Sequence, residues 1–227
     1  DAIDSTIFQD YNGKKYLLWR SWWPQNHLFI REMNATCTAF AGGSSAVDLL
    51  APGAAWEYGV IEGPWMLKRG DYYYLFYSGA DCCNPGDAND YAVGVARRTS
   101  LTGTFTKYSS NPILKKNSTF VSPGHGSILK ALNGEYWHVY HAYQASPLAG
   151  RYQLLDKMSW NGSSWPYFGN GGTPTTTQQG APAVAPDNPA TCYVAAPANG
   201  ATISGTATLS AGGSDDKDII EVAFYRW

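Results

Sequence analysis

The chain has 227 residues and a mass of 24.7 kDa, and 44% of its residues are hydrophobic, which excludes a chain that is disordered throughout. Its 16 Lys and Arg against 18 Asp and Glu give a net charge of −2, which excludes an electrostatic nucleic-acid binder. No apolar run approaches the roughly 18 residues of a membrane span, so we expect no membrane partner. The 16 Tyr, nine Trp and eight Phe favour strands, and 24 Gly and 13 Pro supply turns, so the composition predicts an all-β fold.

Three segments share an apolar strand, a polar turn containing Gly and an aromatic strand: residues 8–19, 66–77 and 128–140. This order is typical of a β-hairpin. The aromatic strands begin near Tyr16, Tyr73 and Tyr136, at spacings of 57 and 63 residues. Further strands are predicted at residues 28–31, 91–97 and 103–107. A period of about 60 residues with four short strands predicts the blades of a β-propeller.

One ionisable residue precedes each aromatic strand by 11 or 12 residues: Asp4, Glu62 and His125. Equivalent positions at the start of the innermost strand of each blade converge on the central channel of a propeller. We therefore expect two carboxylates and an imidazole to meet at one end of the axis. The alternative is that Asp4 and Glu62 cap turns and that His125 is an ordinary loop histidine.

The four cysteines, Cys37, Cys82, Cys83 and Cys192, show no zinc-finger spacing. The adjacent Cys82 and Cys83 allow a vicinal disulfide, a pairing of one of them elsewhere, or two reduced thiols, and the sequence does not separate these. Glycosylation sequons at Asn34, Asn117 and Asn161 favour a secreted, extracellular glycoprotein.

An ordered set of segments resembles glycoside hydrolase family 43, whose members are five-bladed propeller enzymes that act on arabinan and xylan. The matching segments are residues 2–19, 60–64 with 72–78, 91–97, 124–127 with 136–141, and 151–166. The likeness covers residues 1–169, which we expect to be the C-terminal blades of such a propeller. The family has five blades of about 300 residues in all, so we expect an N-terminal part of the propeller outside this chain, as part of the same protein or as a partner.

The resemblance implies an inverting O-glycosyl hydrolase in which Glu62 is the general acid and Asp4 is the carboxylate that orients it. His125 resembles the channel histidine that helps to hold a central ion or water, so a calcium or other ion is an option although no cofactor is required. Arg151 matches an arginine near the sugar pocket. The family's general base is an Asp that opens the first blade, and no residue before Asp4 matches it. Ser5 stands where the family usually has Pro.

Aromatic side chains near these residues are candidates for stacking on sugar rings: Trp22, Trp23, Trp65 and Tyr58. Ordinary core packing is the alternative for each. The expected substrate is an arabinose-containing polysaccharide of plant cell walls, either arabinan or arabinoxylan side chains. The alternatives are a non-catalytic carbohydrate-binding propeller, a xylosidase of the same family, or a structural propeller.

The C-terminal quarter has a different composition. Residues 170–190 are rich in Pro, Thr and Gly, which predicts a linker or an extended arm on the propeller. Residues 191–227 resemble the first strands of an immunoglobulin-like module. A β-sandwich of this kind needs about 100 residues, so we expect the chain to hold a truncated part of it.

Overall fold

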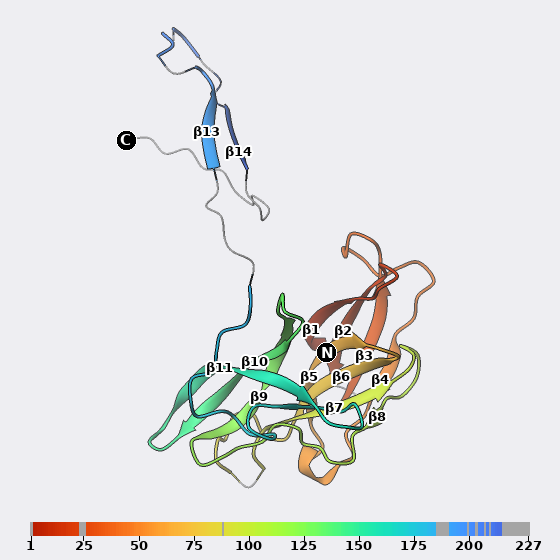
Figure 1. Cartoon of the computed structure of the whole chain (residues 1–227). Coiled ribbons are helices and arrows are strands. Elements are labelled where there is room, and N and C mark those ends of the chain that lie inside the picture. The colour runs from red at the N-terminus through yellow and green to blue at the C-terminus, as the bar shows by residue number, and fades with distance from the viewer. Residues whose placement is uncertain are drawn as a thin grey trace. The chain divides into compact units, whose positions relative to one another are not determined.

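The computed structural model describes residues 2–22, 26–87, 89–184, 191–198, 200–202, 204–206, 208 and 210–214 (Figure 1). The chain divides into two compact units, Asp1–Ala183 and Val184–Trp227. The described elements are strands apart from one short 3₁₀ turn, η1 (Ala55–Glu57), which confirms the all-β prediction. Across the described ranges, no helix has the length and apolar character needed to cross a bilayer.

The first unit contains three four-stranded antiparallel sheets, each with its strands paired in chain order. The first sheet consists of β1 (Ala2–Gln9), β2 (Lys15–Ser21), β3 (His27–Met33) and β4 (Val47–Leu50). The second consists of β5 (Ile61–Arg69), β6 (Tyr72–Gly79), β7 (Ala92–Arg98) and β8 (Thr106–Lys107). The third consists of β9 (Phe120–Lys130), β10 (Tyr136–Ala145), β11 (Leu148–Trp160) and β12 (Pro166–Phe168). These sheets are the blades that the 60-residue period predicted.

The three predicted hairpins are β1–β2, β5–β6 and β9–β10, and their registers pair Tyr16 with Phe8, Tyr73 with Lys68, and Tyr136 with Lys130. Their turns differ in length. The first pairing ends at Gln9 and Lys15, whereas the second ends at Arg69 and Tyr72. The two-residue turn of the second hairpin uses Gly70 at a φ of +56°, a conformation that glycine adopts without a steric cost.

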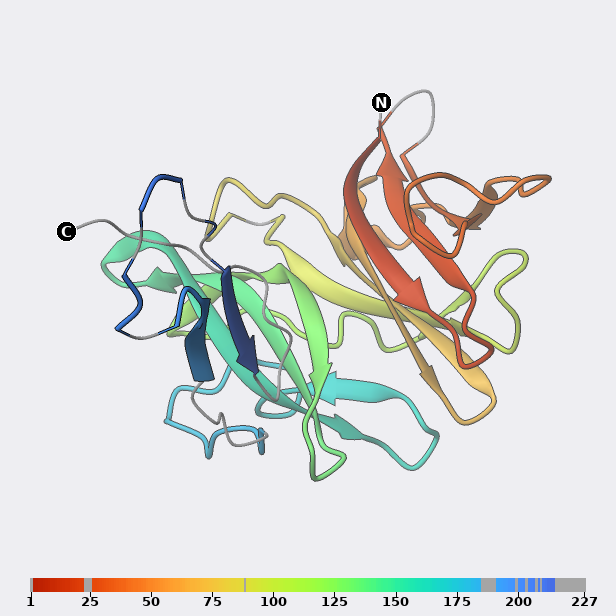
Figure 2. The ribbon, with the colours of Figure 1, turned by 90° about the horizontal axis from the view of Figure 1, so that it is seen from above.

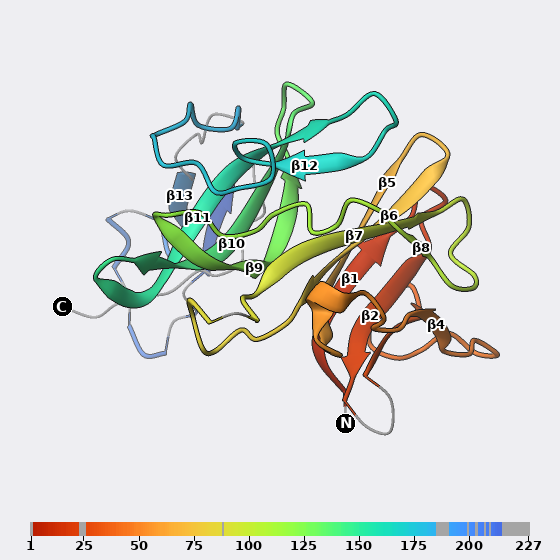
Figure 3. The ribbon, with the colours of Figure 1, turned by 90° about the horizontal axis from the view of Figure 1, so that it is seen from below.

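The second sheet lies between the other two, as the views from above and below show (Figures 2 and 3). One apolar cluster joins the first and second sheets and includes Leu18, Leu28 and Leu75. Another joins the second and third and includes Phe76, Ile128 and Phe168. Each such buried side chain stabilises the fold by about 1.5–3 kcal/mol. This packing fixes the three innermost strands, β1, β5 and β9, relative to one another.

The buried Glu57 anchors the chain on both sides of β5 and β6. Its carboxylate accepts hydrogen bonds from the Tyr77 hydroxyl at 2.8 Å and from the Lys107 ammonium at 2.7 Å. Its backbone carbonyl accepts bonds from the amides of Val60 and Ala80, at 2.9 and 3.1 Å. Because the buried charge is fully paired, its burial is tolerated, and it holds the entry to β5 and the exit from β6 together.

Residues up to Ala183 belong to the first unit, where the Leu132 amide donates to the Ala183 carbonyl at 2.9 Å and Gln179 donates to Asp156 at 2.6 Å. The second unit contains one described antiparallel pair, β13 (Thr191–Ala196) with β14 (Ser210–Ser214). Residues 215–227 lie outside the described residues, and the immunoglobulin-like module stays a prediction.

Candidate active site

Each innermost strand carries a bulge near its start. The registers of β1, β5 and β9 shift between Ile3 and Thr6, between Glu62 and Trp65, and between Gly124 and Ser127. The first bulged residue of each strand has a positive φ: Asp4 at 56°, Gly63 at 57° and His125 at 48°. Such a conformation is costly for a residue with a side chain, and it is found where a side chain must be aimed at a functional site.

These registers correct one detail of the sequence analysis. Asp4 and His125 occupy equivalent bulge positions, whereas Glu62 comes one residue before the bulge of its strand, which begins at Gly63. The equal spacing to the aromatic strand concealed this offset because the intervening turns differ in length.

The expected meeting of the three ionisable groups is nevertheless observed. A carboxylate oxygen of Asp4, a carboxylate oxygen of Glu62 and a ring nitrogen of His125 all lie within 4.8 Å of one another. Asp4 accepts a hydrogen bond from the Gly63 amide at 3.1 Å, and the His125 amide donates to the Ser78 hydroxyl at 2.8 Å. Each blade therefore supplies one member of the cluster, and the backbone of the second blade holds the other two.

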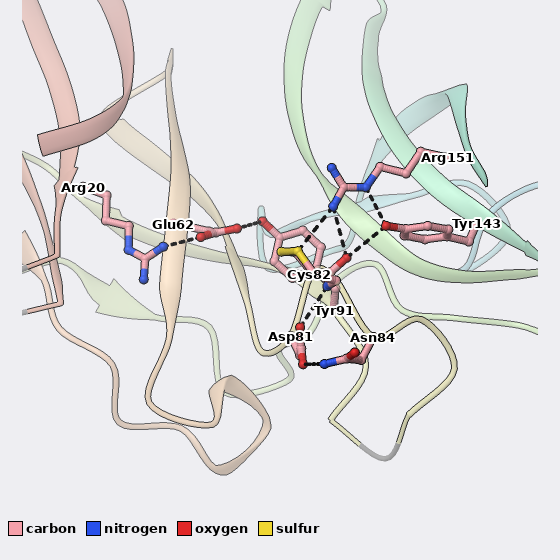
Figure 4. The surroundings of a disulfide bond; sticks show 9 residues. Arg20, Glu62, Asp81, Cys82, Asn84, Tyr91, Tyr143 and Arg151 are labelled. Carbon is pink, nitrogen blue, oxygen red and sulfur yellow. Dashed lines mark hydrogen bonds and ion pairs between the residues drawn. A yellow bond between two sulfur atoms is a disulfide. The ribbon is translucent and has the colours of Figure 1, made fainter. Parts of the chain in front are cut away.

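Glu62 is held by two residues that the sequence analysis did not single out (Figure 4). Arg20, from β2, forms an ion pair with one carboxylate oxygen, and the Tyr91 hydroxyl donates to the other at 2.5 Å. Both residues are almost completely buried, with 1% and 0% exposure. Burial raises the pKa of Tyr91 well above its usual value, and the Glu62 charge raises it further, so the phenol keeps its proton and remains a donor.

Arg20 is also held from other sides. Its Nε donates to the Asn26 side chain at 3.1 Å, and its guanidinium lies 3.8 Å from the centre of the Trp22 ring. Burial lowers the pKa of Arg20, while Glu62 and Asp4 oppose that shift. The signals that could have identified these partners are weak: Arg20 directly follows the first aromatic strand, and Tyr91 opens the segment 91–97.

A cavity of about 270 Å³ opens beside Glu62 and is also lined by Trp22, Tyr58 and Cys82. Trp22 and Tyr58 are each 55% exposed, so both rings offer surface to a ligand. Two of the predicted stacking residues therefore lie at this cavity. Trp23 lies outside the described residues.

A neighbouring cavity of about 510 Å³ is lined by Trp65, His125, His141 and Arg151, among others. The structure thus places the remaining predicted binding residues around His125. His141 stacks on Tyr91 with ring centres 5.7 Å apart. Burial lowers the pKa of His141 to about 4, helped by the nearby Arg151 and His125, so this ring is neutral at pH 7.

Comparison with known proteins decides the family. Residues 1–166 match the family model described as glycosyl hydrolases family 43. The chain belongs to this family.

Two relatives and one solved structure illustrate the range of family 43 proteins that this chain is similar to. It is 28% identical over 200 residues to a xylan 1,3-β-xylosidase of Vibrio sp, covering 76% of this chain and 35% of the relative. It is 29% identical over 183 residues to an extracellular exo-α-(1→5)-L-arabinofuranosidase of Cellvibrio japonicus, covering 73% and 51%. It matches the structure of Cellvibrio cellulosa α-L-arabinanase complexed with arabinohexaose with a TM-score of 0.61 and 25% identity, covering 73% and 56%.

The chain therefore spans about a third to a half of the length of these curated relatives. The family 43 propeller has five blades, and the described residues supply three of them.

The cluster of Asp4, Glu62 and His125 suits a central calcium ion poorly. Calcium prefers six to eight oxygen ligands, whereas this cluster offers two carboxylates and one imidazole. Arg20 already neutralises Glu62, and the Gly63 amide occupies an oxygen of Asp4. A family 43 mechanism built on these residues accordingly needs no step through an ion.

Proposed function

We propose that this chain carries the general acid of an inverting glycoside hydrolase that releases arabinose from arabinan or from arabinoxylan side chains. The observation that carries the proposal is the meeting of Asp4 and Glu62 at the starts of two innermost strands, beside a cavity with exposed aromatic walls. The names of the Cellvibrio relatives, an arabinofuranosidase and an arabinanase bound to arabinohexaose, support the substrate class.

In this mechanism Glu62 protonates the oxygen of the leaving group, while Arg20 and Tyr91 fix the direction of its carboxyl group. Asp4 orients Glu62 and stabilises positive charge that develops on the sugar. Inversion requires about 6.5–9.5 Å between acid and base so that a water fits between them. Asp4 and Glu62 are closer than that, with oxygens within 4.8 Å, so we assign water activation to a third carboxylate from another blade of the propeller.

Substitution of the acid tests the proposal. Glu62→Gln in the full-length protein should lower the rate of arabinose release from arabinan by about 10²- to 10⁴-fold, because a general acid contributes a factor of this size. Glu135→Gln, which removes a carboxylate paired with Lys157 on another hairpin turn, is the matched control and should leave the rate unchanged. Near-normal turnover by Glu62→Gln would reject the role and favour a non-catalytic carbohydrate-binding propeller.

A xylosidase is the second candidate, because the Vibrio relative named for xylan aligns with 76% of this chain. The two activities differ in the sugar ring that enters the cavity beside Glu62. Comparing kcat/KM on nitrophenyl α-L-arabinofuranoside and nitrophenyl β-D-xyloside identifies the preferred ring, and we expect the arabinofuranoside to be preferred.

We further propose that hydrolysis requires no cofactor, since proton transfer and water activation are both assigned to carboxylates. Treatment of the full-length protein with EDTA should change kcat/KM by less than about twofold, within the scatter of such comparisons. A large loss that added calcium restores would instead assign a central ion to His125.

The protein is proposed to act outside the cell. The Cys82–Cys83 disulfide supports this, because disulfides persist in oxidising compartments, and the Cellvibrio japonicus relative is named as extracellular. Glycans on Asn34, Asn117 and Asn161 stay a prediction.

A further inference from the structure

The loop between β6 and β7 connects two parts of the Glu62 site. It leaves β6 at Ala80, which lines the cavity beside Glu62, and it returns at Tyr91, whose hydroxyl holds Glu62. The Asp81 amide donates to the Asn89 carbonyl at 3.0 Å and closes the loop at its base. The conformation of this loop is therefore tied to the position of the proposed acid.

At its start, the loop presents a disulfide between the adjacent residues Cys82 and Cys83 (Figure 4). The Asp81 carboxylate fixes this turn by accepting hydrogen bonds from the Cys83 amide at 2.8 Å and from the Asn84 side chain at 2.5 Å. These bonds lower the pKa of Asp81, so it stays ionised at neutral pH and continues to accept them.

Arg151 ties the same turn to the third blade. Its Nη2 lies 3.4 Å from the Cys82 carbonyl oxygen and 3.5 Å from the Cys83 sulfur, and its Nε donates to the Tyr143 hydroxyl at 2.7 Å. The disulfide is thus held from its own loop by Asp81 and from β11 by Arg151. A surface held from two sides can act as a rigid wall.

The disulfide turn lies against the cavity that contains Glu62, because Cys82 lines that cavity together with Trp22 and Tyr58. Two joined sulfurs carry no thiol proton and form an apolar, polarisable surface. The cavity volume of about 270 Å³ is just below the 300–1,000 Å³ or so that drug-sized ligands occupy, a size that suits a single sugar ring.

We propose that the Cys82–Cys83 disulfide is one wall of the sugar subsite beside Glu62, against which the C–H face of a furanose ring packs, and that Arg151 positions this wall. The proposal rests on the glycosidase function proposed above. Because such a wall contacts the sugar in both the ground state and the transition state, its loss should raise KM and leave kcat largely unchanged.

The test removes the disulfide from the full-length protein by the double substitution Cys82→Ala and Cys83→Ala. Binding of arabino- and xylo-oligosaccharides is measured by calorimetry in the Glu62→Gln background, so that the ligand is not consumed. We expect Kd to rise about five- to tenfold, the size of a lost apolar contact in a pocket, with a similar rise of KM in the active background. Cys37→Ser, which removes a free thiol in another loop, is the matched control and should leave Kd and KM unchanged.

A chemical route gives the same comparison without a substitution. A water-soluble phosphine cleaves the disulfide to two thiols while the phosphine is oxidised to its oxide with an oxygen atom from water. Alkylation and mass measurement confirm that both thiols were formed, and far-UV circular dichroism confirms that the fold is kept. The reduced protein should show the same loss of affinity as the double variant.

The outcomes separate the two proposals. An unchanged Kd after loss of the disulfide overturns the wall while leaving the glycosidase proposal intact. A fall in kcat at constant KM also overturns it, because the loop would then act on Glu62 through Tyr91. If no arabino- or xylo-oligosaccharide binds the protein with its disulfide intact, the proposed function fails, and the subsite fails with it.

Discussion

At the scale of single residues, the proposed acid is defined by partners from far along the chain. Glu62 is 42 residues from Arg20 and 29 residues from Tyr91. The spacing of the hairpins predicted that Asp4, Glu62 and His125 approach one another, because the three occupy the same end of repeated units. Arg20 and Tyr91 belong to no repeated pattern, and their contacts with Glu62 depend on how strands and blades pack, which local sequence does not encode.

A buried histidine predicts how stability depends on pH. His138 stacks between Tyr140 and Phe168, with ring centres 4.8 and 4.1 Å away, and burial lowers its pKa to about 3. The unfolded chain takes up this proton near pH 6.5, so between about pH 6.5 and 3 the unfolded state binds more protons than the folded state. The free energy of unfolding should therefore fall as the pH falls through this window, by at most about 1.4 kcal/mol per pH unit for this group.

Urea titrations of the full-length protein at several pH values from 7 to 4 measure this slope. His138→Phe keeps an aromatic ring at the position and removes the titrating group, so its slope should be shallower whatever its absolute stability. His141, with a pKa of about 4, contributes with the same sign and accounts for a remaining slope. Equal slopes for the two proteins would contradict the assignment to His138.

At the scale of elements, the aromatic hairpins were the strongest signal in the sequence. The predicted strands at residues 28–31 and 91–97 correspond to β3 and β7, and the one at 103–107 is reduced to Thr106–Lys107. The bulges could not be predicted, because an extra residue in a strand leaves the alternation of side chains readable only on either side of it. The offset of Glu62 from the other two cluster residues is the direct result.

Two glycines with the same backbone conformation separate strain from function. Gly63 and Gly70 have φ values of +57° and +56°, and a Cβ at Gly63 would lie 3.2 Å from the His125 ring, whereas one at Gly70 meets nothing within 4 Å. Gly63→Ala and Gly70→Ala should each lower the free energy of unfolding by about 1 kcal/mol. Only Gly63→Ala should also displace His125 and lower kcat/KM, by about tenfold or more. Parallel denaturation and kinetic measurements compare the two, and equal activities would show that the position of His125 is unimportant for turnover.

At the scale of the whole molecule, the three blades bring together an acid and a neighbouring carboxylate but not the wider pair that inversion needs. The oxygens of Asp4 and Glu62 lie within 4.8 Å, near the separation of about 5–5.5 Å typical of retaining enzymes. Family 43 membership favours inversion, which makes a carboxylate from another blade part of the reaction. The stereochemistry of the product distinguishes the two arrangements.

Proton NMR of the first product formed by the full-length protein from an α-L-arabinofuranoside makes this measurement. We expect the β-anomer of arabinose to appear first and the α-anomer to grow in later by mutarotation. Initial release of the α-anomer would mean that Asp4 acts as a nucleophile opposite Glu62 and would overturn the assignment of water activation to a third carboxylate.

The ion pair from β2 to Glu62 also bears on how such propellers can be recombined in the laboratory. Glu62 belongs to the second blade, yet its carboxylate is held by Arg20 of the first, and Tyr91, which binds its other oxygen, stacks on His141 of the third. A chimera that exchanges the second blade alone would receive a new acid without the neighbours that aim it. Transplanting all three blades as one cassette would keep that aim intact.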